Sequence, residues 1–493
     1  MQSVRQPYVK KFILDIFAYL PSKIFPLLLS FLWSYIFTRI FTPEEYGIYG
    51  LIIAITGPLV TVITEWAAQP IGRFYSEYKN SSFQLVYYLI LRRFTIIVFL
   101  LSIIIIVVSI IWGYFFYQSY LFLIIPAGIS IIFNALSSLY MPILPASLDS
   151  RAFRKQQILR SVSRLVIAVS LVFGINSNVA FLVWADALSS IIFFFPLMNI
   201  IKNKIGLKEI KEDRINKNNI IQNHIKRFYG YGFPMMLWFF SSQLLNVGDR
   251  FAIQYFLGEK EVGIYTANYM LIYGISGLLS APISLAAFPL IMKLWVNRDE
   301  ERMVIVIKNM TLVFSIISIG VIGGTYLIAK PLSIIALGRE FSEGYTVIFP
   351  VVLGLVVWQA SMLGHKGMEL KESTGIMVKL IILSACVNMV LNFLFIPIYG
   401  YEAAAWATFA SYSLYAILVW YKSKDYIKWE VNVSQIVSFV IISIIGIFIS
   451  SFIQIENVYI EITAKASLFS FCYLSLSALY LFATKEHNNI FNV

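Results

Sequence analysis

Long apolar runs, separated by short polar connectors, organise the chain from about residue 20 to residue 484. A helix needs about 20 mainly apolar residues to cross a bilayer. The runs are of that length, and they lack the ten-residue alternation that is typical of membrane β-barrel strands. The pattern predicts an all-α polytopic membrane protein with fourteen transmembrane helices, at residues 20–41, 46–71, 93–116, 120–146, 156–175, 179–201, 228–256, 262–292, 303–329, 343–364, 374–396, 402–421, 431–453 and 463–484.

Composition supports the membrane assignment. Charged residues make up 13% of the chain, whereas soluble domains carry about 25%. The two cysteines, Cys386 and Cys472, both lie in apolar runs, so we expect neither a disulfide nor a cysteine metal site. Residues 1–17 are basic and lack the apolar core and cleavage site of a secretory signal. We expect them to lie along the inner membrane face.

Basic residues set the expected orientation. If the N-terminus is cytoplasmic, 27 of the 38 Lys and Arg residues fall on inner ends and loops, 5 on outer connectors and 6 within spans. This distribution follows the positive-inside rule and predicts that both termini are cytoplasmic. The net charge of +12 is then explained by topology and by attraction to anionic headgroups. No nucleic-acid partner is expected.

A short connector occurs twice in the chain. FTPEEYGIY at residues 41–49 and LGEKEVGIY at residues 257–265 share four of nine positions. They follow the first and the seventh predicted helix, so the pattern predicts two six-helix repeats of the same orientation, with a substrate site between them. The expected parts are an N-terminal lobe (1–201), a basic cytoplasmic linker (202–227), a C-terminal lobe (228–424), and a final part with two helices and a cytoplasmic tail (425–493).

Three segments resemble one superfamily, in the same order and spacing. They are TRIFTPEEYGIYGL, LLNVGDRFAIQYFLGEKEVGIYTANY and IPIYGYEAAAWATFA. They are similar to the polysaccharide-flippase branch of the multidrug/oligosaccharidyl-lipid/polysaccharide exporters, and the similarity extends over essentially the full length.

The resemblance implies a V-shaped, two-lobed bundle in the bacterial cytoplasmic membrane. Such a protein moves polyprenyl-pyrophosphate-linked repeat units of O-antigen, capsule or exopolysaccharide to the outer leaflet by alternating access. Its expected partners are the lipid-linked oligosaccharide, the bilayer and other polysaccharide-assembly membrane proteins. No cofactor is implied beyond a coupling ion, Na⁺ or H⁺.

One group of polar residues falls on the fifth predicted helix. A charge at a helix centre costs about 2.5–3.5 kcal/mol on insertion scales, so such residues usually face a wet cavity. Arg154, Gln157, Arg160 and Arg164 lie within an arc of roughly 120°. They are interpreted as a cationic ladder for pyrophosphate, because guanidinium binds phosphate bidentately. Snorkelling to the inner surface is the alternative, and it accounts for Arg154 better than for Arg164.

A second polar stripe falls on the seventh predicted helix. Gln243, Asn246, Arg250 and Gln254 lie within roughly 80°, with Asp249 at the edge. The stripe predicts a surface that faces the lumen. The alternative is an Asp249–Arg250 pair that only stabilises the lobe.

Five further residues complete the candidate substrate-contacting set. Lys23 and Lys379 either snorkel or meet an anionic headgroup, and Arg39 lies on an outer connector. Glu65 and Asp186 either neutralise the cations of the lumen or relay protons.

The resemblance also implies a candidate sodium site in the C-terminal lobe. Its ligands would be Asp249, Asn388, Asn392, Thr408 and the carbonyl of Ala404. Oxygen ligands suit a hard cation, although Asn392 stands where the pattern can have Asp, which weakens cation attraction. Hydrogen bonding between helices is the alternative role of the two amides.

Two other functions remain open. A multidrug exporter of the same superfamily would prefer an acidic or apolar lumen and commonly has twelve helices. A membrane polysaccharide polymerase or glycosyltransferase would need a large outer loop with catalytic groups, and the predicted outer loops are short. We therefore expect a transporter without catalytic residues.

Overall fold

The protein is seen in a computed structural model that describes residues 21–79, 81, 83–116, 121–147, 149–205 and 217–484. Within these ranges the chain forms helices and no strand. Eleven of the described helices are long and apolar enough to cross a membrane, and residues 24–37 form a shorter apolar helix. The all-α, polytopic class is confirmed, whereas the count of fourteen spans stays a prediction. The basic run at residues 1–17 and the tail after residue 484 lie outside the described residues.

The chain divides into two compact units. Unit 1 consists of Met1–Glu44 and Phe251–Val493, and unit 2 of Glu45–Arg250. Unit 1 therefore includes the first predicted span, and unit 2 includes most of the seventh. The division into lobes at 1–201 and 228–424 stays a prediction.

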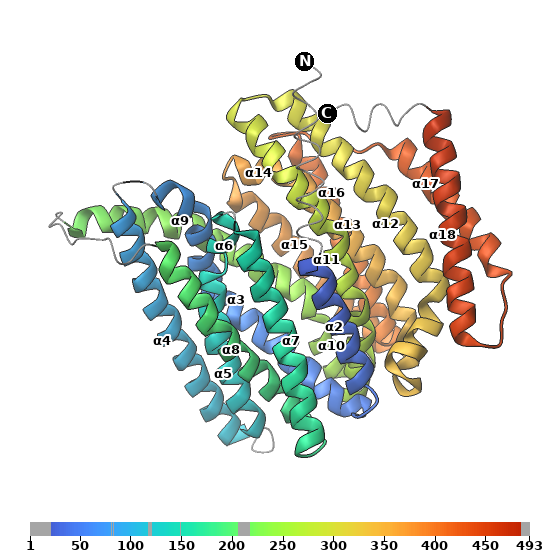
Figure 1. Cartoon of the computed structure of the whole chain (residues 1–493), viewed down its shortest axis with the longest axis horizontal. Helices are drawn as coiled ribbons and strands as arrows, with labels where there is room; N and C mark the ends of the chain where they lie inside the picture. Colours follow the sequence, from blue (N-terminus) through green and yellow to red (C-terminus); the bar gives the residue numbers. More distant parts are fainter. Residues whose placement is uncertain are drawn as a thin grey trace. The chain divides into compact units, whose positions relative to one another are not determined.

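Unit 2 is built around an aromatic core. Its helices are α3 (Pro43–Lys79), α4 (Gln84–Phe116), α5 (Leu121–Tyr140), α6 (Ile143–Ala146), α7 (Ser150–Gly174), α8 (Ala180–Ile205) and α9 (Lys217–Val247). Helix α8 packs against both α5 and α7, and α4 packs against α5 (Figure 1). Phe228 of α9 is fully buried against Phe74 and Phe94, which fixes α9 to this unit.

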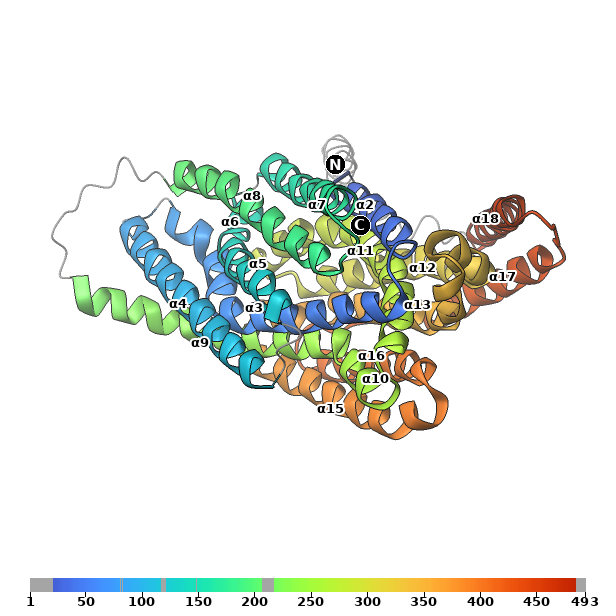
Figure 2. The ribbon, with the colours of Figure 1, turned by 90° about the horizontal axis from the view of Figure 1, so that it is seen from below.

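Unit 1 holds the remaining helices. They are α2 (Pro21–Phe37), most of α10 (Asp249–Leu257), α11 (Glu259–Val296), α12 (Glu300–Leu337), the 3-10 helix η2 (Arg339–Val347), α13 (Ile348–Gly364), α14 (Lys366–Leu370), α15 (Thr374–Tyr399), α16 (Tyr401–Ser423), α17 (Val433–Ser451) and α18 (Val458–Ala483). Helix α2 packs on α11 and α12, and the α17–α18 hairpin lies beside α12 (Figure 2). Phe469 and Tyr473 of α18 fill this second interface.

Glycines mark two of the helix junctions. Gly258, between α10 and α11, has φ +96°, and Gly400, between α15 and α16, has φ +69°. Residues with a Cβ rarely adopt these values, so the chain can turn there only with glycine at low cost. The seventh predicted helix, expected to be continuous over 228–256, is interrupted at Gly248, where α9 ends and α10 begins.

Candidate functional site

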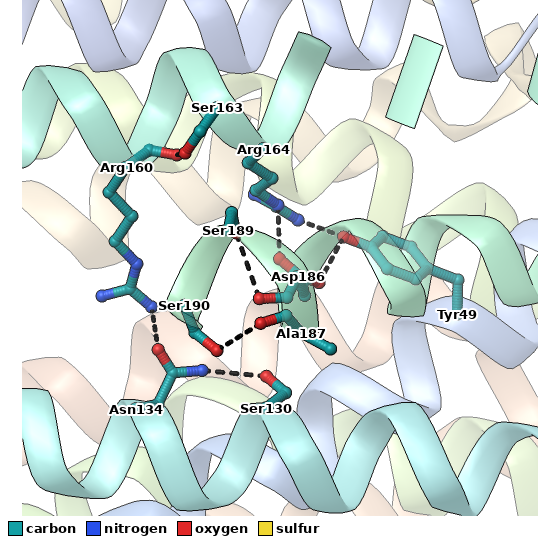
Figure 3. Close-up of polar contacts among 10 residues, drawn as sticks. All are labelled: Tyr49, Ser130, Asn134, Arg160, Ser163, Arg164, Asp186, Ala187, Ser189 and Ser190. Carbon is teal, nitrogen blue, oxygen red and sulfur yellow. Dashed lines mark hydrogen bonds and ion pairs between the residues drawn. The ribbon is translucent and has the colours of Figure 1, made fainter. Parts of the chain in front are cut away.

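A polar cluster joins three membrane-spanning helices of unit 2 (Figure 3). Arg164 of α7 pairs with Asp186 of α8, with 2.5 Å between Nε and Oδ1. Its guanidinium also donates to the hydroxyl of Tyr49 of α3, and that hydroxyl donates to Asp186 Oδ2 at 3.3 Å. Tyr49 is fully buried, whereas the side chains of Arg164 and Asp186 are 30% and 25% exposed. Asp186 therefore neutralises Arg164 while both remain accessible.

Arg160 lies one turn away on α7 and has a different environment. Its Nη2 donates to Asn134 Oδ1 of α5 at 2.7 Å, and the amide of Asn134 donates to Ser130 Oγ at 2.9 Å (Figure 3). The guanidinium also lies over the ring of Phe193, 5.6 Å from its centroid. Among the described residues, no carboxylate lies within ion-pair distance of Arg160, and its side chain is exposed. Its positive charge is thus held in place by neutral groups.

The other members of the α7 stripe lie nearer its beginning. Arg154 and Gln157 are half-buried. Asp149 caps the start of α7: its carboxylate accepts from the N–H of Ala152 at 2.9 Å and pairs with Lys204 of α8 at 2.7 Å. The hydrogen bond from Lys204 is the main reason that the pKa of Asp149 lies below its usual range. This end of α7 is therefore capped and tied to α8.

The second predicted stripe is divided between two helices. Gln243 and Asn246 belong to α9, and Arg250 and Gln254 to α10. Because the helix is interrupted between them, a constant angle per residue does not place all four on one helix face. Arg250 Nη1 donates to Asp249 Oδ1 at 3.0 Å and to the carbonyl of Asn246 at 2.8 Å. Asp249 is fully buried and Arg250 is 3% exposed. The pairing alternative is present, and contact of this stripe with a lumen stays a prediction.

Arg39 forms main-chain contacts within unit 1. It donates to the carbonyls of Tyr35 at 2.7 Å, Ile335 at 2.6 Å and Ala336 at 3.2 Å. These carbonyls lie in the last turns of α2 and α12, where helix carbonyls lack partners within the helix. Arg39 thus satisfies helix ends, in addition to any contact with substrate.

The remaining predicted lumen residues, Glu65, Lys379 and Lys23, belong to three different helices. Glu65 of α3 is half-buried and accepts from Gln69 at 2.7 Å, and Lys379 of α15 is exposed. Lys23 lies in α2, but its side chain is outside the described residues. Glu65 belongs to unit 2 and Lys379 to unit 1, so contact of these residues with one lumen stays a prediction.

Most ligands of the candidate sodium site lie within unit 1. Asn388, Asn392 and Thr408 are 3%, 2% and 1% exposed, and Ala404 is fully buried. Asn392 Nδ2 donates to Asn388 Oδ1 at 3.0 Å. Within the described part of the chain, Asn392 Oδ1, Thr408 Oγ1 and the donor Asn388 Nδ2 have no hydrogen-bond partner. Buried oxygen atoms without donors fit a hard cation. Asp249 belongs to unit 2, and the complete ligand set stays a proposal.

Sequence reasoning missed Tyr49, Asn134 and Ser130. A signal for Tyr49 was available, because it ends the GIY motif that recurs at Tyr265, and both tyrosines are fully buried. Asn134 is an amide in an apolar run, which by itself indicates a polar contact inside the membrane.

These features define a multi-pass helical membrane protein with charged side chains inside its spans. The sequence matches the family described as "Polysaccharide biosynthesis protein" over residues 13–295, and the chain belongs to this family. None of the curated protein sequences matches the chain.

Solved structures share the fold. The structure titled "Lipid II flippase MurJ, inward closed conformation" matches with a TM-score of 0.73 and 16% identity, over 96% of this chain and 99% of that chain. An inward-facing multidrug resistance MATE family transporter of the MOP superfamily matches with a TM-score of 0.59 and 13% identity, over 85% and 96%. A MOP superfamily transporter from Pyrococcus furiosus matches with a TM-score of 0.57 and 12% identity, over 83% and 94%. At these identities the likeness concerns the fold.

Proposed function

We propose that the protein is a flippase for polyprenyl-pyrophosphate-linked oligosaccharides. It moves the repeat unit from the cytoplasmic to the outer leaflet of the bacterial cytoplasmic membrane, with both termini cytoplasmic. The headgroup crosses through a cationic cavity while the prenyl chain stays in lipid, and the protein performs no covalent chemistry. Membership of the polysaccharide biosynthesis family and the flippase-like fold support this proposal.

The exposed guanidinium of Arg160 is the main structural observation that supports the flippase proposal. A charge within a span is costly unless it faces water or meets an opposite charge. The described partners of Arg160 are an amide and a ring, so its charge remains available to an anionic ligand. Guanidinium binds phosphate oxygens bidentately, and pyrophosphate provides several such oxygens.

Arg164 supports the same ligand in a different way. Its charge is balanced by Asp186 at 2.5 Å, but the pair is accessible. A pyrophosphate that arrives at Arg160, one turn away, can take the place of Asp186 as the partner of Arg164. The released carboxylate would then disfavour the loaded state and promote release of the anion, with Na⁺ or H⁺ as the candidate coupling ion.

The charge of the cluster supports a flippase rather than a multidrug exporter. Arg160 and Arg164 together outweigh Asp186 by one positive charge. A cationic drug would be repelled by this balance, whereas an anionic headgroup is attracted.

The function can be tested by complementation: the gene for this protein is deleted in the native host, and the unmodified gene or a variant is supplied in its place. We expect Arg160→Ala to reduce surface polysaccharide at least tenfold and Arg160→Lys to restore part of it. Arg302→Ala is the matched control, because Arg302 is 75% exposed at the start of α12. Normal polysaccharide in both Arg160→Ala and Arg164→Ala strains, at normal expression, would overturn the proposal.

A further inference from the structure

A groove runs between α15 and α16 in unit 1. One wall consists of Leu391, Phe395 and Tyr399, which are spaced four residues apart on α15. The floor consists of Ala403 and Ala407 of α16, which are 8% and 4% exposed. Alanine leaves the space above it unfilled, and the resulting cavity has a volume of about 430 Å³. The wall rises over about 12 Å, given the helical rise per residue.

The groove is open on the side where apolar side chains are exposed. Phe395, Tyr399 and Trp406 border it and are 41%, 67% and 47% exposed. Phe393 and Leu394 beside them on α15 are also about half exposed, at 49% and 58%. Exposed apolar faces of a membrane-spanning helix contact lipid rather than water. A ligand that enters from this side is therefore an alkyl chain.

One end of the groove is acidic. Glu402, in the first turn of α16, lines this end and is exposed. Helix α16 contacts α11 and η2, and Glu261 of α11 and Glu343 of η2 interact electrostatically with the hydroxyl of Tyr401, the residue before Glu402. Among the described residues, no Lys or Arg is within ion-pair distance of these three groups. A negative potential at this end repels anionic headgroups and attracts cations.

We propose that this groove binds one alkyl chain of a phospholipid whose headgroup carries a primary ammonium, as phosphatidylethanolamine does. The chain lies over Ala403 and Ala407 between the aromatic side chains, and the ammonium meets the carboxylate of Glu402. An ammonium provides three donors and a full positive charge. Phosphatidylglycerol has the same chains but a net negative headgroup, so the acidic end disfavours it.

Native mass spectrometry of the purified full-length protein, with equal amounts of phosphatidylethanolamine and phosphatidylglycerol, tests this site. Two variants distinguish the contribution of the lipid headgroup to binding from that of the alkyl chain. Glu402→Gln removes the charge, and Ala410→Phe places a ring over the groove from an exposed lining position. The matched controls are Glu456→Gln, an exposed acid between α17 and α18, and Ile417→Phe, which is 61% exposed further along α16.

We expect the unmodified protein to retain the ethanolamine lipid at least threefold over the glycerol lipid. Glu402→Gln should remove this preference, Ala410→Phe should lower retention of both lipids, and the controls should behave as the unmodified protein does. Equal retention of the two lipids by the unmodified protein would overturn the proposal. Preference for the anionic lipid, or a dimeric mass in place of lipid adducts, would also overturn it. Because Glu402 is exposed, Glu402→Gln should fold normally, and it still tests the headgroup preference if Ala410→Phe does not fold.

Discussion

Arg164, Asp186 and Tyr49 show what a residue-level reading of the sequence can and cannot predict. The two charges were identifiable because charged side chains inside apolar runs are rare and costly. Neutralisation of cations was one of two expected roles of Asp186, but its pairing with Arg164 was not specified. The part of Tyr49 was not identified, because its contacts join α3 to α7 and α8 across 115 and 137 residues of chain. Helical angles order residues on one helix, whereas the pairing of helices is set by packing. Arg160 was likewise identified as a candidate site residue from the sequence, whereas Asn134, which accepts a hydrogen bond from it, was not.

The Arg164–Asp186 pair should show energetic coupling. Removing one partner leaves the other charge uncompensated in a partly exposed site, so Arg164→Ala and Asp186→Ala should each destabilise the protein. The double variant should be more stable than the sum of the two effects predicts, by about 1 kcal/mol, because neither charge is then left alone. Thermal unfolding in detergent measures this, and strictly additive effects would contradict the pairing.

His365 should make stability depend on pH. It is 4% exposed between α13 and α14, 3.2 Å from the hydroxyl of Tyr415. Burial and the charge of Lys366 lower its pKa from 6.5 to about 4, against the weaker opposing effect of Glu369. The unfolded chain therefore binds the proton more readily than the folded one between these values. Stability should be complete above pH 6.5 and decline as the pH falls towards 4, by on the order of 3 kcal/mol.

Apparent melting temperatures at pH 7.5 and 4.5 check this expectation. The difference should shrink in His365→Gln, which cannot take up a proton in this range. An unchanged difference in the variant would show that other groups cause the pH dependence.

At the scale of elements, each of the fourteen predicted segments overlaps a described helix, but the boundaries differ. Helix α3 continues to Lys79, beyond the expected end at residue 71, and α4 begins at Gln84 rather than at residue 93. Hydropathy marks the part of a helix that lipid covers, whereas hydrogen bonding continues into the polar ends. The break at Gly248 was missed because polar residues continue on both sides of it.

The connector between α16 and α17 depends on a glycine at the end of α13. The indole N–H of Trp429 donates to Thr311 Oγ1 at 2.9 Å, and a Cβ at Gly364 would lie within 3 Å of the indole ring. Gly364→Ala should therefore displace the ring and cost about 1–3 kcal/mol. Gly375→Ala on α15 is the matched control, since nothing lies within 4 Å of a Cβ there. This packing would be contradicted if Gly375→Ala lowered the melting temperature, or if Gly364→Ala left it unchanged.

At the scale of the whole molecule, the sequence allowed the membrane class and the family to be predicted. Helical spans require long apolar runs, and the duplicated connector and the two other segments are sufficient to indicate the superfamily, in agreement with the family match. The sugar could not be predicted, because contacts with a sugar use dispersed polar and aromatic side chains without a fixed spacing. The candidate sodium site stays a prediction, since its ligands belong to both compact units.

Transport of a lipid-linked oligosaccharide in proteoliposomes tests the central claim most directly. The purified protein is reconstituted with a polyprenyl-pyrophosphate-linked oligosaccharide from the native host, and an added glycosidase reports the fraction exposed outside. We predict that the protein makes the inner pool accessible, that Arg160→Ala slows this at least tenfold, and that Arg302→Ala does not. An inner pool that stays protected with the unmodified protein, or equal rates with and without Arg160, would contradict the account.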